Sequence, residues 1–157
     1  MKKIIILLLL TIGFVGCKPQ QTVTSTKMDN KSELAIKGNW TIVSVTYPGS
    51  DYIKMTSFDI ADSKCFVGST WRFISNDNKG TMALTASNCP PFSSPITWYI
   101  NKDGNFVMKI TNGTKAKKVV DGYILTIANQ TESSFQLIDK VDVGGQMVNA
   151  VYQFQRS

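Results

Sequence analysis

The chain has 157 residues, of which 43% are hydrophobic and 18% are charged, and it contains no histidine. This length fits one domain with its own core, and this composition excludes a chain that is disordered throughout. The lack of histidine removes the commonest general base and the commonest metal ligand. We therefore expect a protein that is not an enzyme and that has no cofactor and no metal site.

Residues 1–16 have the pattern of a bacterial export signal. Two lysines lie near the start, an apolar run extends from Ile4 to Ile12, and small residues come just before Cys17. The run is too short to span a bilayer as a stable helix. The pattern resembles the lipobox of bacterial lipoproteins, whose cysteine is acylated and becomes the first residue, with Phe14 in place of the usual leucine. The alternative is an ordinary secretory signal and an incidental cysteine.

The lipobox resemblance implies that palmitate or similar acyl chains on Cys17 hold the protein on a lipid bilayer, since two or three chains make a stable anchor. The residues after Cys17 lack the acidic cluster that resembles a surface-export signal. We therefore expect a lipid-anchored protein of the bacterial cell envelope, in the outer membrane and facing the periplasm. The polar composition of residues 17–36 predicts a flexible tether, with a short helical turn near Ser32, that adds little to the core.

Positive charge is mild and scattered once the signal is removed. Loss of Lys2 and Lys3 leaves 15 basic residues against 11 acidic ones, a net charge of +4. Basic residues gather only at Lys115, Lys117 and Lys118, whereas a nucleic-acid surface needs a longer basic stripe with interleaved aromatic residues. We therefore expect no nucleic-acid partner, and we expect a monomer.

Cys65 and Cys89 remain as a pair once Cys17 is acylated. Exported proteins commonly contain disulfides, whereas a redox or metal pair usually has CxxC spacing or nearby histidines. The sequence therefore predicts a disulfide between Cys65 and Cys89. In the chain-entropy model, closing a loop of about 25 residues stabilises the fold by roughly 3.5 kcal/mol.

Apolar and polar residues alternate from residue 39 onward with the period of two that is typical of strands. Turn residues divide this region into eight segments without a convincing long helix. We expect strands at about 39–47, 69–75, 81–86, 96–100, 106–110, 117–128, 134–139 and 148–156. Residues 51–68 are too apolar for a solvated loop and are expected to form a flap or short helix held by Cys65. Eight such strands can form a sandwich or a closed barrel, and only the closed barrel removes the exposed edges.

Closure of a barrel would bring the first strand beside the last. Gly38 and Trp40 open the first strand, and Arg156 ends the last strand on the same face as Tyr152 and Phe154. The guanidinium would then lie over the indole, in a contact worth about 0.5 to 2 kcal/mol. A Gly-x-Trp opening, eight strands and a terminal Arg together resemble the lipocalin family, and most closely the short lipocalin-like lipoproteins of Bacteroidetes.

This resemblance implies an all-β domain over residues 37–157, folded as an eight-stranded antiparallel up-and-down barrel. Gly38, Trp40 and Arg156 are expected to close the barrel floor and to bind no ligand. The inward-facing residues either fill the core themselves or enclose one small ligand at the opposite end, beneath the flap. The candidates for lining such a pocket are Trp71, Phe73, Met82, Leu84, Trp98, Phe106, Met108 and Tyr123, with Ile100, Leu125 and Phe135 on the same stripes.

Three functions are open on these grounds, and the third, an enzyme built on the barrel mouth, is the least favoured. The first is non-enzymatic binding of a small hydrophobic or amphipathic ligand in the cell envelope. The second is a lipid-anchored interaction or inhibitor module with a packed barrel and no small ligand. An enzyme would need convergent acids at the barrel mouth, whereas the close pairs Asp59 with Asp62 and Asp139 with Asp142 are interpreted as turn or cap residues.

Overall fold

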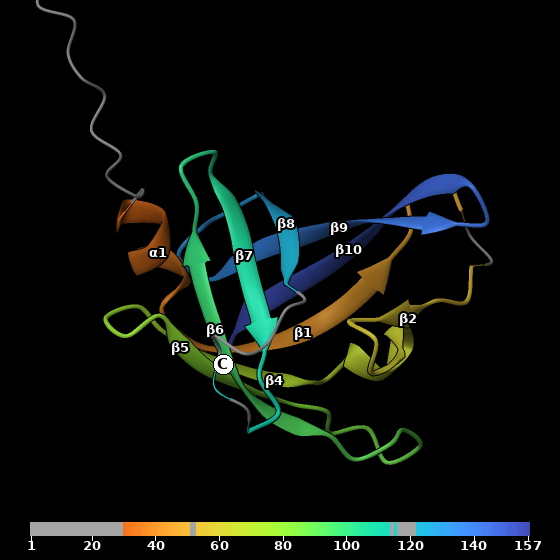
Figure 1. Ribbon diagram of the computed structural model, residues 1–157, viewed down its shortest axis with the longest axis horizontal. Coiled ribbons are helices and arrows are strands. Elements are labelled where there is room, and N and C mark those ends of the chain that lie inside the picture. The colour runs from red at the N-terminus through yellow and green to blue at the C-terminus, as the bar shows by residue number, and fades with distance from the viewer. Residues whose placement is uncertain (1–29, 51–52, 114, 116–121) are drawn as a thin grey trace, which may run out of the picture.

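The computed structural model describes residues 30–50, 53–113, 115 and 122–157. Cys17, the export signal, most of the expected tether and residues 117–121 of the sixth expected strand lie outside the described residues. Eight antiparallel strands close into a barrel in the order β1-β10-β9-β8-β7-β6-β5-β4 (Figure 1). The strands are β1 (Gly38–Thr46), β4 (Thr70–Ile74), β5 (Lys79–Ala83), β6 (Ser93–Ile100), β7 (Asn105–Ile110), β8 (Tyr123–Ala128), β9 (Ser134–Val143) and β10 (Gln146–Arg156). The predicted eight-stranded up-and-down barrel is therefore confirmed.

β1 closes the barrel because it pairs on both of its edges. Trp40 lies opposite Arg156 of β10 on one side and opposite Trp71 of β4 on the other. The register between β1 and β10 shifts between Ile42 and Ser44, which is the mark of a β-bulge. The lower part of β1 therefore pairs with both neighbours, and its upper part continues along β10 alone.

β5 begins earlier than the sequence predicts, because Gly80 is a strand residue and not a turn residue. It pairs with Phe73 and with Ile96, in the middle of the sheet. A Cβ added at Gly80 would lie 2.3 Å from the backbone oxygen of Arg72 and 3.0 Å from the Ile96 side chain. Glycine here allows the neighbouring strands to approach closely, which is a second use of glycine besides turns.

β9 and β10 form a longer hairpin than expected. The predicted strand ends at Asp139, whereas the pairing continues to Val143 opposite Gln146, across a turn with two glycines at positive φ. Beyond Asp139 the residues Lys140, Val141 and Asp142 keep the alternation of exposed and half-buried positions. The hairpin projects past the barrel wall, as Figure 1 shows.

The segment after β1 folds over the barrel mouth as a flap, as expected. It consists of a hairpin of β2 (Thr56–Ser57) and β3 (Ala61–Asp62), followed by the short 3₁₀ helix η1 (Ser63–Phe66). The predicted disulfide between Cys65 and Cys89 is present, with 5.7 Å between the two Cα atoms. It ties η1 to the connection between β5 and β6.

The expectation that residues before 37 add little to the core is wrong for the helix α1 (Asn30–Ile36). Ile36 is completely buried, and its carbonyl oxygen accepts a hydrogen bond of 2.7 Å from the Trp40 indole. The buried carboxylate of Glu33 accepts a hydrogen bond of 3.0 Å from the backbone N–H of Ile100. α1 therefore covers the barrel floor. Separately, no helix in the described part of the chain is long and apolar enough to cross a membrane.

Arg156 holds the floor together in the way that the sequence predicts. Its guanidinium carbon lies 4.3 Å from the centre of the Trp40 ring. The same group donates hydrogen bonds to the carbonyl oxygens of Glu132, Lys37 and Ala35 at 2.7, 3.1 and 3.0 Å. Gly38 makes this geometry accessible, because a Cβ at that position would lie 2.6 Å from Nη1 of Arg156. The backbone φ of Gly38 is +131°, a value that glycine adopts without strain.

Replacing Arg156 with alanine should lower the free energy of unfolding by about 1 to 3 kcal/mol, because the cation–π contact and the donors to three carbonyl oxygens are lost. Thermal denaturation followed by circular dichroism measures this loss as a lower Tm. Arg72→Ala is the matched control, since Arg72 is exposed on β4 and its removal should cost less than about 0.5 kcal/mol. Equal melting temperatures in the two variants would contradict this account of the floor.

Candidate ligand site at the barrel mouth

The predicted pocket residues all face the barrel interior, where they pack against one another. The rings of Trp98 and Phe106 stack with centres 5.5 Å apart, and Phe73 meets Trp98 edge to face at 5.3 Å. Tyr123 is half-buried, and the other seven are buried: Trp71, Phe73, Met82, Leu84, Trp98, Phe106 and Met108. These residues form a close-packed core that reaches the mouth at Trp71 and Tyr123, so they line a ligand only where that core can open.

The floor of the barrel offers no such opening. Phe135 and Phe154 stack with ring centres 4.6 Å apart, and Trp40 meets Phe135 edge to face at 4.7 Å. Ile36 of α1 is completely buried in the same core cluster, and its carbonyl oxygen accepts the hydrogen bond of the Trp40 indole. A ligand site at this end would require the removal of the closure between β1 and β10.

At the mouth, the space beneath the flap is filled by the ring of Phe58. Phe58 stacks on Tyr152 with 5.1 Å between ring centres, and Phe66, Tyr123 and Trp71 surround it at 5.3, 5.1 and 6.3 Å in edge-to-face contacts. The flap supplies this ring, whereas barrel strands supply most of its neighbours. One part of the core therefore belongs to a segment outside the barrel wall.

Phe58 is held in this place by a strained turn. Phe58 and Asp59 have φ angles of 52° and 54°, and Ile60 donates a backbone hydrogen bond of 3.0 Å to Ser57. Consecutive left-handed residues in such a turn are normally glycine or asparagine, and each other residue there costs about 1 to 2 kcal/mol. The surrounding contacts must therefore offset this strain in the closed flap.

Two tyrosine hydroxyls of the barrel hold the turn from below. Tyr152 donates a hydrogen bond of 2.7 Å to the hydroxyl of the buried Ser57, and Tyr123 donates one of 3.3 Å to the Asp59 carboxylate. Burial raises the pKa of Tyr152 well above its usual value, so this hydroxyl keeps its proton under ordinary conditions. The hydrogen bonds from the barrel are directional contacts that the flap loses when it moves.

Asp139 is an inward-facing carboxylate of β9 near these hydroxyls. It lies opposite Ala150, which precedes Tyr152 by two residues on the same face of β10. Burial raises the pKa of Asp139, and a hydrogen bond from the backbone N–H of Lys140 opposes that change. The negative charge of Asp139 contributes to raising the pKa of Tyr152, although burial is the main cause.

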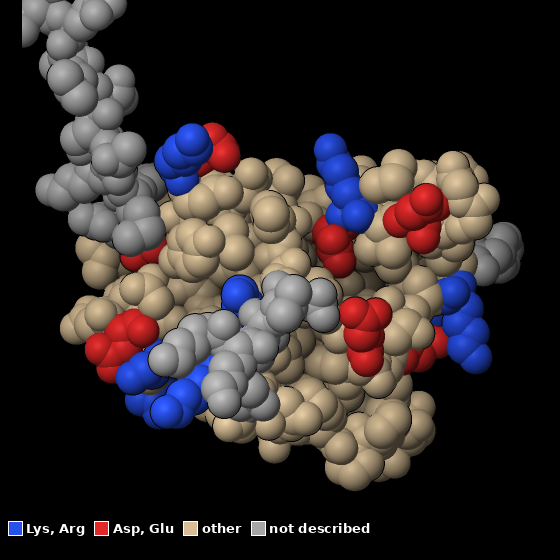
Figure 2. Space-filling model, viewed as in Figure 1, with Lys and Arg blue, Asp and Glu red and all other residues tan. Residues whose placement is uncertain are grey.

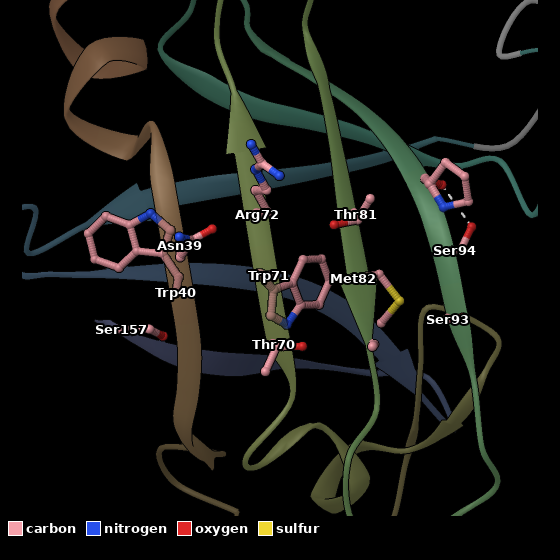
Figure 3. A pocket seen from close by; sticks show the side chains of 12 residues that line it. Asn39, Trp40, Thr70, Trp71, Arg72, Thr81, Met82, Ser93, Ser94 and Ser157 are labelled. Atoms are coloured by element: carbon pink, nitrogen blue, oxygen red, sulfur yellow. Dashed lines mark hydrogen bonds between the residues drawn. The ribbon is translucent and has the colours of Figure 1, made fainter.

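Several depressions mark the outer surface. One of about 590 Å³ crosses β1, β4, β5 and β6 and is shown in Figure 3, where Thr70, Arg72 and Thr81 project from neighbouring strands. Small outward side chains on adjacent strands produce this hollow. A second depression of about 630 Å³ lies beside the flap, where Tyr47 hydrogen bonds to Ser63. The face of the molecule seen in Figure 2 carries small, separated groups of charged side chains.

The described residues contain no group of three or more Cys, Asp or Glu side chains that could hold a metal ion. The two acidic pairs noted in the sequence do not converge on one point. Asp62 caps η1 through a hydrogen bond of 2.9 Å from Lys64, and Asp142 accepts one of 2.7 Å from Gly145 in the hairpin turn. These two residues therefore act as the expected cap and turn residues, whereas Asp59 and Asp139 lie at the mouth.

Phe58 and Asp139 are the residues of this site that sequence reasoning missed. The alternation Phe135, Leu137, Asp139 already placed Asp139 on the inward face, so its position was open to prediction. No such signal existed for Phe58, because the turn around it contains neither glycine nor asparagine.

The closed barrel, the Gly-x-Trp floor and the aromatic interior define a small lipocalin-like binding fold. The sequence model of the lipocalin-like domain matches residues 36–137, and the chain belongs to this family. The family assignment that the sequence suggests is thereby confirmed. Such a barrel is suited to binding a small hydrophobic molecule.

Solved odorant-binding proteins are similar in structure. Bovine odorant-binding protein in complex with a selenium-containing odorant is 12% identical, with a TM-score of 0.45, over 80% of this chain and 72% of that chain. Odorant Binding Protein OBP1 is 11% identical, with a TM-score of 0.44, over 80% of this chain and 73% of that chain. No curated protein matches the chain significantly.

Asp139→Asn should stabilise the protein near neutral pH. The raised pKa means that the folded protein favours the protonated carboxyl, so this stabilisation is present below the ordinary value of 3.8 and is lost as the pH rises through the folded pKa. Asparagine imitates the protonated form at every pH. The difference in Tm between the variant and the wild type should therefore be clear at pH 7 and shrink as the pH falls to about 3.

The control for this measurement is Asp103→Asn, in the exposed turn between β6 and β7. That variant should leave the pH profile of Tm close to that of the wild type. A Tm difference for Asp139→Asn that stays constant from pH 3 to 7 would contradict the burial of a charged group at the mouth.

Proposed function

We propose that the protein is a non-enzymatic, lipid-anchored member of the bacterial cell envelope that binds a small hydrophobic ligand at the barrel mouth, in the place of the Phe58 ring. The observation that carries the proposal is that the flap, and not a barrel strand, supplies this ring. Phe58 fills a slot of the core, yet it comes from a strained turn of the flap and not from a barrel strand.

Replacing the Phe58 ring with a ligand costs less free energy than removing a barrel-strand residue from the core. A strand residue such as Phe106 can leave the core only if the sheet is disrupted, because both neighbouring strands pair with β7. Phe58 leaves when a short hairpin swings out, and the left-handed strain of its turn is then relieved. A ligand ring that replaces Phe58 restores the buried apolar contacts, which are worth about 1.5 to 3 kcal/mol for one large side chain.

The walls of the slot stay in place when the hairpin moves. Trp71, Tyr123 and Tyr152 belong to barrel strands, and Phe66 follows Cys65, which is joined to Cys89. The disulfide thus separates the flap into an anchored part, η1, and a part that can move, the β2–β3 hairpin. A site with preformed walls loses little conformational freedom when it binds its ligand.

The second candidate is a protein-interaction or inhibitor module with a permanently packed barrel. The close packing of the interior favours it, and the outer hollow across β1, β4, β5 and β6 would then be available to a partner. Native mass spectrometry of protein purified from its own envelope separates the two functions. A reproducible small molecule that co-purifies supports ligand binding, and its consistent absence supports the interaction module.

Phe58→Ala should raise the affinity for 2-phenylethanol by about tenfold or more, because the protein's own ring no longer competes for the slot. Isothermal titration calorimetry measures the affinity, and the wild type should bind the same probe more weakly. Phe106→Ala is the matched control, since it removes the same ring from a barrel strand. No binding to the wild type at millimolar probe, or equal gains in both variants, would contradict a site at Phe58.

The anchor is tested separately. The lipobox resemblance supports acylation of Cys17, so the N-terminal peptide of the membrane-extracted protein should begin at Cys17 and carry acyl chains in mass spectrometry. Cys17→Ala should move the protein from the membrane fraction to the soluble fraction. An unmodified Cys17 within a longer or shorter chain would refute the anchor and leave the binding proposal standing.

A further inference from the structure

The slot of Phe58 has the shape of a box for one flat ring. Tyr152 lies parallel to the Phe58 ring within 29°, whereas Phe66, Trp71 and Tyr123 meet it at 68°, 64° and 84°. Stacked and edge-to-face contacts of this kind are worth about 0.5 to 1.5 kcal/mol per pair beyond the burial of area. A flat aromatic group regains them, and an alkyl chain does not.

The charge beside this box is negative. Asp139 lies on the face of β9 that carries the buried Phe135 and Leu137, and its partner across the ladder is the small residue Ala150. Within the described residues Asp139 makes no ion pair, because the one ion pair found there joins Lys79 and Asp77 on the surface. No lysine or arginine occurs among the buried residues of the described ranges.

A half-buried carboxylate without a cation beside it is unfavourable for the protein alone. Burial indeed raises the pKa of Asp139. A ligand that brings a positive charge reverses this cost, because a charge-assisted hydrogen bond to a half-buried carboxylate is stronger than one between neutral groups. The surrounding aromatic rings also favour a cation, through their negative faces.

We infer that the ligand of the mouth site is a small aromatic amine, whose ring takes the place of Phe58 and whose ammonium group contacts Asp139. Asp59 is a second carboxylate near the mouth, but its hydrogen bond with Tyr123 ties it to the flap hairpin, so it moves away with Phe58. The buried Glu33 is excluded, since it lies at the floor and accepts its hydrogen bond from Ile100. The inference rests on the proposed function, because the ring of the ligand takes the place that Phe58 leaves.

Three probes of similar shape test the charge preference: 2-phenylethylamine, 2-phenylethanol and 3-phenylpropionate. The full-length protein, purified from its membrane, is placed in phosphatidylcholine nanodiscs, with empty nanodiscs as the blank, and titrated by calorimetry at pH 7. The wild type should bind the amine about tenfold or more tightly than the alcohol, a difference of about 1.4 kcal/mol, and the carboxylate probe most weakly.

Asp139→Asn should reduce the ratio of amine to alcohol affinity to about one, because the negative partner is gone. Asp59→Asn is the matched control and should keep the wild-type ratio. A thermal melt of each variant shows that it is folded under the titration conditions. Retention of the amine preference in Asp139→Asn, or its loss in Asp59→Asn alone, would overturn the assignment to Asp139.

The outcomes also separate this inference from the proposed function. If the wild type and Phe58→Ala bind all three probes with equal affinity, the site exists and the amine preference is wrong. If neither protein binds any probe, the site at Phe58 is refuted, and the amine assignment is refuted with it.

Discussion

The barrel depends on the contact between Arg156 and Trp40. β1 has to pair with β4 and with β10 at the same level, and the arginine fixes that meeting point by covering the indole and binding three carbonyl oxygens. Gly38 is part of the same constraint, since any side chain there would collide with the guanidinium. With the first and last strands joined in this way, the eight described barrel strands form a closed sheet, and the projecting end of the β9–β10 hairpin keeps free edges.

Closure at the floor has consequences for the other end. α1 and the rings above it make the lower barrel a close-packed core, which supplies hydrophobic stabilisation without strain. The mouth carries the unfavourable features, namely two left-handed residues and an inward carboxylate. Strain and uncompensated charge persist in proteins where the remaining structure is stable enough to tolerate them, and they gather at functional sites.

The barrel could be predicted from the sequence because its strands follow a regular alternation of apolar and polar residues. Strand alternation, the floor residues and the pair Cys65 and Cys89 each follow from local patterns or simple counting. The errors occurred where tertiary contacts decide: Gly80 became a strand residue because its neighbours approach closely, and α1 became part of the core through Ile36. Phe58 escaped prediction because its left-handed conformation comes from its ring contacts and not from its own preference.

The flap links these features into one equilibrium. In the closed state the Phe58 ring satisfies the aromatic box, and two tyrosine hydroxyls hold the turn. In the open state the turn loses these contacts and regains a relaxed backbone, so the two states differ by less than burial of the ring alone would suggest. The apparent affinity of any ligand is reduced by the population of the open state. Selectivity then depends on groups that Phe58 cannot satisfy, and the Asp139 carboxylate is such a group.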